Sequence, residues 1–119
     1  MEATPVQLIA AQGGTKSILI DRVAFTITRT ATAFTGGGAV QIQYGNTANN
    51  GGTQALDSTI ASTVITGAAG TTITYRNGAI ISDLAAASIQ NIGLFITNAT
   101  AVFAAGTGTA TVDIWYFTY

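Results

Sequence analysis

The sequence predicts an all-β protein, a jelly-roll-like antiparallel β-sandwich of about eight strands with one short helix. Three observations support this prediction. β-Branched and aromatic residues alternate with polar residues in several segments, which is the two-residue period of a half-buried strand. Glycine- and asparagine-rich turns separate these segments. The chain has 119 residues, of which 48% are apolar, so we expect one domain over residues 1–119 with a single core.

The alternation is clearest in five segments. Their apolar faces are Val23, Phe25 and Ile27; Val40, Ile42 and Tyr44; Ile73 and Tyr75; Ile92, Leu94 and Ile96; and Val112, Ile114 and Tyr116. Weaker strands are expected at residues 6–10, 17–20, 79–82 and 101–104. In the second segment, Gln41 and Gln43 fall on the opposite, outer face.

The connections between strands carry residues that accept turn conformations. Asn77 and Gly78 predict a tight hairpin, because both tolerate a positive φ. Residues 35–38 read Thr-Gly-Gly-Gly and indicate a flexible tip between two strands. The longest connection, residues 45–52, is polar and uncharged, and we expect it at an exposed end of the molecule.

One segment, residues 56–65, breaks the strand pattern. Leu56, Ile60 and Val64 share one face of a helix, and Asp57 or Ser58 is suited to cap its start. Gly67 would end it, so we predict a short helix here despite the high content of β-branched residues. A second helical turn is expected within residues 83–88, which are rich in alanine.

Asp21 is a charged residue in phase with an apolar face. It has the same parity as Val23 and Phe25, which a regular strand would bury. A strand boundary, a bulge and a buried, paired carboxylate each explain this position, and the boundary is the favoured interpretation.

The most unusual feature of the composition is its low charge. Charged residues make up 8% of the chain, against about 25% in an average soluble domain. The four basic residues are Lys16, Arg22, Arg29 and Arg76. They are too few to neutralise many phosphates, so we expect no nucleic-acid partner and no binding to anionic membranes. No apolar run is long enough to cross a bilayer, and the N-terminus does not resemble a secretory signal.

The inventory of reactive side chains is thin. The chain has no His and no Cys, which excludes the usual catalytic triads, thiol nucleophiles and thiolate metal sites. Its acids are Glu2, Asp21, Asp57, Asp83 and Asp113, and their spacing does not suggest a catalytic pair. The 45–52 loop has asparagines but no carboxylate for calcium. We therefore expect no enzyme activity, no small-molecule substrate, no cofactor and no metal site.

The last strand carries large side chains on both faces. Trp115, Phe117 and Tyr119 alternate with its other apolar face, and a sandwich strand needs only one such face. Large exposed aromatic patches are rare on monomers, so we predict that these residues form a subunit interface, together with Phe95, which is out of phase in its own strand. The alternative is that a loop or residues 6–10 fold over this face.

The order of these segments resembles the small jelly-roll structural proteins of tailed bacteriophages, notably the capsid decoration or cement proteins. The resemblance covers most of the chain and rests on residues 17–28 (SILIDRVAFTIT), 39–45 (AVQIQYG), 56–65 (LDSTIASTVI) and 108–119 (GTATVDIWYFTY). It implies a homotrimer on the outer surface of the virion capsid, bound to the major capsid protein and locking neighbouring capsomers together. It also implies synthesis in the host cytoplasm. The family offers no catalytic residues to carry over.

Two other functions remain open. Related β-domains occur in phage tail and fibre proteins, where the asparagine-rich loop and the aromatic residues would bind a receptor or a glycan. An enzyme is the third possibility, and the missing His and Cys argue against it.

Overall fold

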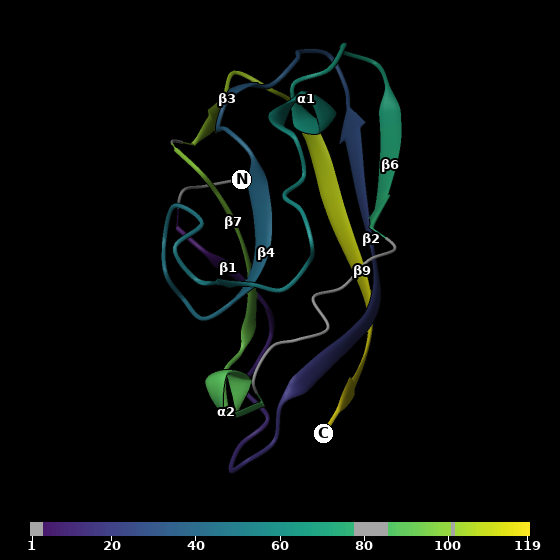
Figure 1. Ribbon diagram of the computed structural model, residues 1–119. Helices are drawn as coiled ribbons and strands as arrows, with labels where there is room; N and C mark the ends of the chain where they lie inside the picture. The colour runs from purple at the N-terminus through teal and green to yellow at the C-terminus, as the bar shows by residue number, and fades with distance from the viewer. Residues whose placement is uncertain (1–3, 78–85, 101) are drawn as a thin grey trace.

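Two antiparallel sheets pack face to face (Figure 1). The structure is a computed structural model that describes residues 4–77, 86–100 and 102–119. Within these residues, one sheet has the order β1-β7-β4-β5, formed by β1 (Val6–Ile9), β7 (Leu94–Asn98), β4 (Val40–Tyr44) and β5 (Thr53–Gln54). The other has the order β6-β2-β9, formed by β6 (Thr72–Asn77), β2 (Ile18–Arg29) and β9 (Gly108–Thr118). A small pair joins β3 (Thr35–Gly36) to β8 (Phe103–Ala104). The predicted all-β sandwich is confirmed.

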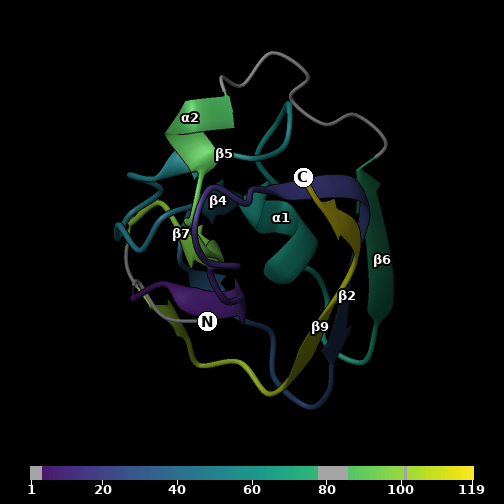
Figure 2. The same ribbon diagram turned by 90° about the horizontal axis from the view of Figure 1, so that it is seen from below.

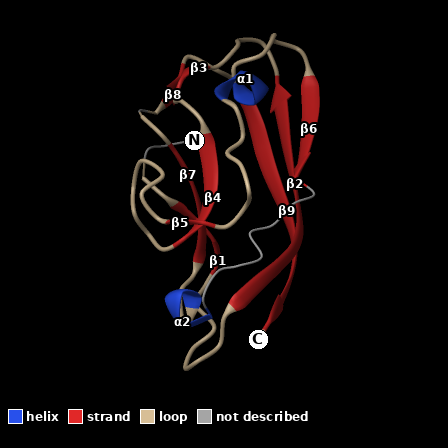
Figure 3. Cartoon of the chain, in the orientation of Figure 1, coloured by secondary structure: helices blue, strands red, loops and turns tan. Residues whose placement is uncertain are grey.

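The core side chains come from both sheets, which lie on opposite sides of the molecule in the view from below (Figure 2). Phe25 of β2 and Leu94 of β7 are both 0% exposed, because every second residue of each strand points into the space between the sheets. The alternation therefore located the core residues of β2, β4 and β7. Strands and helices are distinguished in Figure 3, where strands account for most of the regular structure.

Tyr44 links the two sheets through its side chain. Its hydroxyl group, on β4, donates a hydrogen bond of 2.7 Å to the backbone carbonyl of Ile18, on β2. Burial raises the pKa of the Tyr44 phenol above its ordinary value of 10.0, because the phenolate loses hydration inside the protein.

The helix predicted over residues 56–65 is much shorter than expected. Helix α1 is the single turn Ser62–Ile65, with Ala61 at its N-cap and Thr66 at its C-cap. The prediction of a cap at Asp57 or Ser58 is therefore wrong, whereas the predicted end is confirmed, since Gly67 directly follows the C-cap Thr66. The backbone of Ile60 instead exchanges two hydrogen bonds, of 2.7 and 2.8 Å, with Val40 of β4. An extended bridge suits the β-branched residues that precede α1.

Arg29 is a buried cation that holds the end of α1. The residue is 2% exposed, and its guanidinium group donates to the carbonyls of Val64, Ile65 and Ala68 and to the hydroxyl of Thr71. Val64 and Ile65 are in the last turn of α1, where carbonyl groups have no partner within the helix. The planar fork of Arg29 thus satisfies several backbone acceptors at once and anchors α1 at one end of the core.

Helix α2 (Ala86–Ile89) overlaps the second predicted helical segment, residues 83–88, and extends one residue beyond it. Residues 83–85 of that segment are outside the described residues. The same holds for the expected strand at residues 79–82 and for Gly78 of the predicted hairpin turn. Two other weak strands are present, since residues 6–10 and 101–104 contain β1 and β8.

Asp21 forms a bulge in a single long strand. Residues 17–20 and the segment with Val23 were expected as two strands, but β2 runs unbroken through both. The pairing with β9 skips from Ile20 to Arg22, so Asp21 is the extra residue and its side chain is exposed. Of the three interpretations of Asp21, the bulge is therefore the correct one, and it places the carboxylate in solvent.

The 45–52 loop folds back over β4 and buries two side chains that the alternation had placed on an outer face. Gln43 is 0% and Gln41 5% exposed. The Gln43 amide donates to the carbonyls of Gly45 and Thr47, and the Gly52 N–H donates to the Gln43 side-chain oxygen. The amide of Gln41 donates to the Gly52 carbonyl. Part of this loop is therefore a polar cover on the sheet.

The Thr-Gly-Gly-Gly segment also makes more backbone contacts than the sequence predicted. Thr35 and Gly36 form β3, and the buried carbonyl of Gly37 accepts a hydrogen bond of 2.7 Å from the Asn98 side chain. The expectation of a flexible tip is wrong because this backbone is paired with β8 and tied to β7.

Candidate protein interface on strand β9

Strand β9 is an edge strand within the described part of the chain. It pairs with β2 along its whole length, and no strand among residues 4–77, 86–100 and 102–119 pairs with its second edge, which we call the free edge. The odd-numbered backbone groups point towards β2, since Tyr119 exchanges two hydrogen bonds with Ser17 and the carbonyl of Thr107 accepts one from Thr30. In an antiparallel ladder, the direction of these groups alternates along the strand. The even-numbered residues of β9 therefore direct their N–H and C=O groups to the free edge.

The outer face of β9 is strongly aromatic. Trp115 is 44%, Phe117 57% and Tyr119 79% exposed. We call these three residues the aromatic face. They share one side of the strand because they are two positions apart, so the structure brings together three of the four residues predicted for an interface.

Arg22 completes this face. It is opposite Trp115 in the register of β2 and β9, and its guanidinium carbon lies 4.3 Å from the centre of the indole ring. The cation is attracted by the negative face of the ring, and its planar group can stack there while its N–H groups stay in water. One positive charge therefore lies against the aromatic face, and the exposed Asp113, on the same side of β9, adds one negative charge beside it.

Phe95 lies on the other sheet. It is opposite Gln43 of β4 and Gln7 of β1 in the register of the strands, and its neighbours Leu94 and Ile96 point into the core. Its side chain therefore belongs to the outer side of the four-stranded sheet. The structure does not join Phe95 to the aromatic face.

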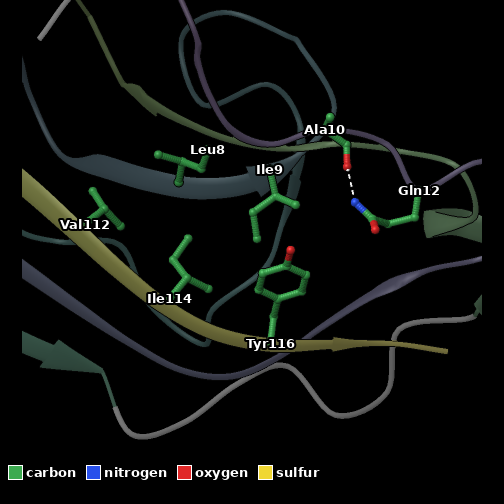
Figure 4. A pocket seen from close by; sticks show the side chains of 7 residues that line it. All are labelled: Leu8, Ile9, Ala10, Gln12, Val112, Ile114 and Tyr116. Carbon is green, nitrogen blue, oxygen red and sulfur yellow. Dashed lines mark hydrogen bonds between the residues drawn. The ribbon is translucent and has the colours of Figure 1, made fainter.

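The inner face of β9 lines an open groove opposite β1. The groove has a volume of about 450 Å³. We call it the β9 groove, and its lining residues are Leu8, Ile9, Ala10, Gln12, Val112, Ile114 and Tyr116. Figure 4 shows Leu8 and Ile9 facing the side chains from β9 across this space. Tyr116 is 44% exposed although it is on the core-facing side of its strand.

The position of β1 answers the alternative raised from the sequence. Leu8, Ile9 and Ala10 of this segment lie across the groove from Ile114 and Tyr116, on the inner side of β9. They do not cover the aromatic face. The sequence pattern could not show the groove, because it gives the two faces of a strand but not the neighbours of its edges.

The described residues contain little else that could support chemistry. Within them, no group of three or more His, Cys, Asp or Glu side chains comes together to hold a metal ion. Asp21, Asp57 and Asp113 are separately exposed. No helix in the described residues is long and apolar enough to cross a membrane.

Comparisons with protein-family models, with curated proteins and with solved structures each give no match.

Proposed function

We propose that this protein is a virion structural protein, a decoration subunit that binds the outer surface of an assembled capsid through the aromatic face and stabilises the shell. The observation that carries the proposal is the exposure of Trp115, Phe117 and Tyr119 in one row. Tryptophan and tyrosine are the residues most often found at the energetic centres of protein interfaces. A row of such anchors suits contact with another protein.

The surroundings of the aromatic face suit a permanent protein contact. The outer side of β2 and β6 carries paired threonine hydroxyls, with 3.1 Å between Thr26 and Thr74 and 3.3 Å between Thr72 and Thr28. Hydroxyl groups that already hydrogen-bond to one another do not need new hydrogen-bond partners when another protein covers them. Because few charges are involved, binding would depend only weakly on ionic strength.

The proposed mechanism is mass action. A subunit that binds the assembled shell but not its dissociated parts lowers the free energy of the assembled state by its own binding free energy. Many copies on one shell add their contributions, so each contact can be small. The partner in this proposal is the major capsid protein, and no catalytic group is required.

Co-sedimentation with capsids assembled without the protein tests this proposal. The wild-type chain should bind, and the double variant Trp115→Ala, Phe117→Ala should bind at least about tenfold more weakly, because it loses two aromatic anchors. Val102→Ala is the matched control, since Val102 is 52% exposed but lies outside β9. Equal binding by the double variant and the wild type, or no binding by the wild type, would contradict the proposal.

A second candidate is a tail or fibre domain that binds a receptor or a glycan. The stacked pair of Arg22 and Trp115 favours it, because an exposed indole ring with adjacent hydrogen-bond donors can bind a sugar ring. Electron microscopy of labelled particles separates the two. Many copies over the head support decoration, and a few copies at the tail support adhesion.

A further inference from the structure

We propose that the free edge of β9 pairs with β9 of a second copy of this chain, antiparallel and about a two-fold axis at Ile114. The pairing would join two three-stranded sheets into one continuous sheet with the order β6-β2-β9-β9-β2-β6. The inference concerns the edge and inner side of β9. It does not depend on the proposed binding to a capsid.

The backbone of β9 offers a suitable template. Ala110, Val112, Ile114, Tyr116 and Thr118 present their N–H and C=O groups to the free edge, as the bonds of Tyr119 and Thr107 on the opposite side require. An unpaired row of this kind is open to pairing with another strand.

Strand β9 also lacks the features that usually protect an edge. It has 11 residues, with no proline and no lysine among them, and Asp113 is its one charged residue. The irregularity in the sheet is at Asp21 of β2, so β9 itself has no bulge. Edge strands of natural monomeric proteins normally carry a proline, a lysine or a bulge. The absence of these features from β9 favours pairing with another strand.

The two faces of β9 restrict the register of such a pair. A slip by one residue would place the aromatic face against the inner face, so the two-fold axis must pass through a residue. The candidates near the middle of the strand are Asp113, Ile114 and Trp115. A centre at Asp113 puts two carboxylates directly opposite each other, which is unfavourable. A centre at Trp115 pairs the two indole rings, which is favourable in itself, but it sets each Asp113 opposite the apolar Phe117 of the other copy.

The centre at Ile114 matches large residues with small ones. It sets Trp115 opposite Asp113, Phe117 opposite Thr111, and Tyr119 opposite Thr109 of the second copy. The even-numbered residues then form the hydrogen-bonded pairs, as the free edge requires. The sequence of β9 is therefore complementary to itself in this register.

Charge complementarity supports the same register. Arg22 lies over Trp115, and Asp113 of the second copy would be the direct neighbour of that Trp115. The guanidinium group of one copy is then beside the carboxylate of the other, and the two-fold axis repeats the contact. Each copy carries a formal net charge of −1, so general repulsion between the copies is weak.

The β9 groove supplies a place for the added strand's inner residues. The sheet that contains β9 has one strand fewer, within the described residues, than the sheet that contains β1. A strand added at about 4.8 Å from β9 would direct its Val112, Ile114 and Tyr116 to the inner side, where Leu8 and Ile9 of the first copy line the groove. Apolar surface that is open in one copy would be buried in the pair.

Cysteine cross-linking tests the register directly, because the chain has no cysteine of its own. In the proposed pair, Ile114→Cys places two thiols in opposite positions about 5.5 Å apart at their Cα atoms, within the range for a disulfide. The variant should form a covalent dimer under mild oxidation. Ala110→Cys is the control and should not, because each residue 110 would be opposite residue 118. Cross-linking at position 113 or 115 in place of 114 would overturn the register.

Sedimentation equilibrium over a range of concentrations tests the contact itself. The wild type should approach twice the chain mass of 12.1 kDa. Asp113→Arg should raise the dimer dissociation constant at least about tenfold by placing like charges together, and adding Arg22→Asp should restore dimerisation. Asp57→Arg, an exposed acid outside β9, is the charge-matched control. A wild type that is a monomer at all concentrations, or the trimer that the phage resemblance implies, would overturn the inference. Capsid binding by a monomeric Asp113→Arg variant would show that capsid binding does not require the pairing of β9 with a second copy.

Discussion

The guanidinium carbon of Arg22 lies 4.3 Å from the centre of the Trp115 ring, across the pairing of β2 with β9. Trp115 is the one tryptophan of the chain, so tryptophan fluorescence reports on the surroundings of this residue alone.

Replacing Arg22 should change the surroundings of Trp115 with little effect on folding. We expect Arg22→Ala to shift the emission of Trp115 and to lower the free energy of unfolding by no more than about 1 kcal/mol, because the stacking is on an exposed surface. Arg22→Lys should keep part of the effect. Fluorescence and urea unfolding measure both quantities. A loss of several kcal/mol would show that Arg22 has a structural role that its position does not indicate.

Replacing Arg29 should be far more damaging. Arg29→Met leaves the carbonyls of Val64 and Ala68 without their buried donor, so we expect a loss of about 3–5 kcal/mol in unfolding free energy. Arg29→Lys should recover only part of the lost stability, because an ammonium group cannot reproduce the planar set of N–H donors of the guanidinium group. Urea unfolding, with Arg22→Met as the exposed control, makes the comparison. Similar losses for Arg29→Met and Arg22→Met would contradict the assigned role.

The raised pKa of Tyr44 predicts a loss of stability at high pH. Below the ordinary value of 10.0 the phenol is protonated in both the folded and unfolded states, so its contribution is constant. Above that pH the unfolded state loses the proton first, and stability falls as pH rises towards the folded-state pKa. Tyr44→Phe should reduce this fall and should cost about 1 kcal/mol at neutral pH through the lost bond to Ile18. Thermal unfolding from pH 7 to 11 checks both effects, and the same alkaline slope in wild type and variant would refute the assignment.

Two neighbouring glycines should differ in their tolerance of a side chain. Both Gly36 and Gly37 have a positive φ, of 75° and 78°, so alanine is strained at either position. A Cβ at Gly37 would also overlap the ring of Phe103, whereas at Gly36 the nearest atom is the Val102 carbonyl oxygen at 3.7 Å. We expect Gly37→Ala to lose about 1–3 kcal/mol more than Gly36→Ala in chemical unfolding. Equal losses would show that the ring moves aside at no cost.

The sequence predicted the sandwich because alternation follows directly from burying one face of a strand. Phe25 and Leu94 are in the core for that reason. It misplaced Gln41 and Gln43, since their burial depends on how the 45–52 loop folds back, which no local period describes. It extended a helix through Ile60, whose backbone instead bonds to distant Val40.

The candidate interface was likewise predictable only in part. Trp115, Phe117 and Tyr119 were predictable together because they belong to one face of one strand. Phe95 could not be separated from them, since strand order in the two sheets is set by long-range pairing. The free edge of β9 and its groove depend on the same pairing, and they emerge only with the structure.

The rupture temperature of shells assembled without this protein, measured before and after its addition, tests the central claim most directly. We predict that the wild-type chain raises this temperature and that the Trp115→Ala, Phe117→Ala double variant does not, although both are folded. The claim that the aromatic face of β9 stabilises a shell would be contradicted by an unchanged rupture temperature with the wild type, or by an equal rise with the double variant.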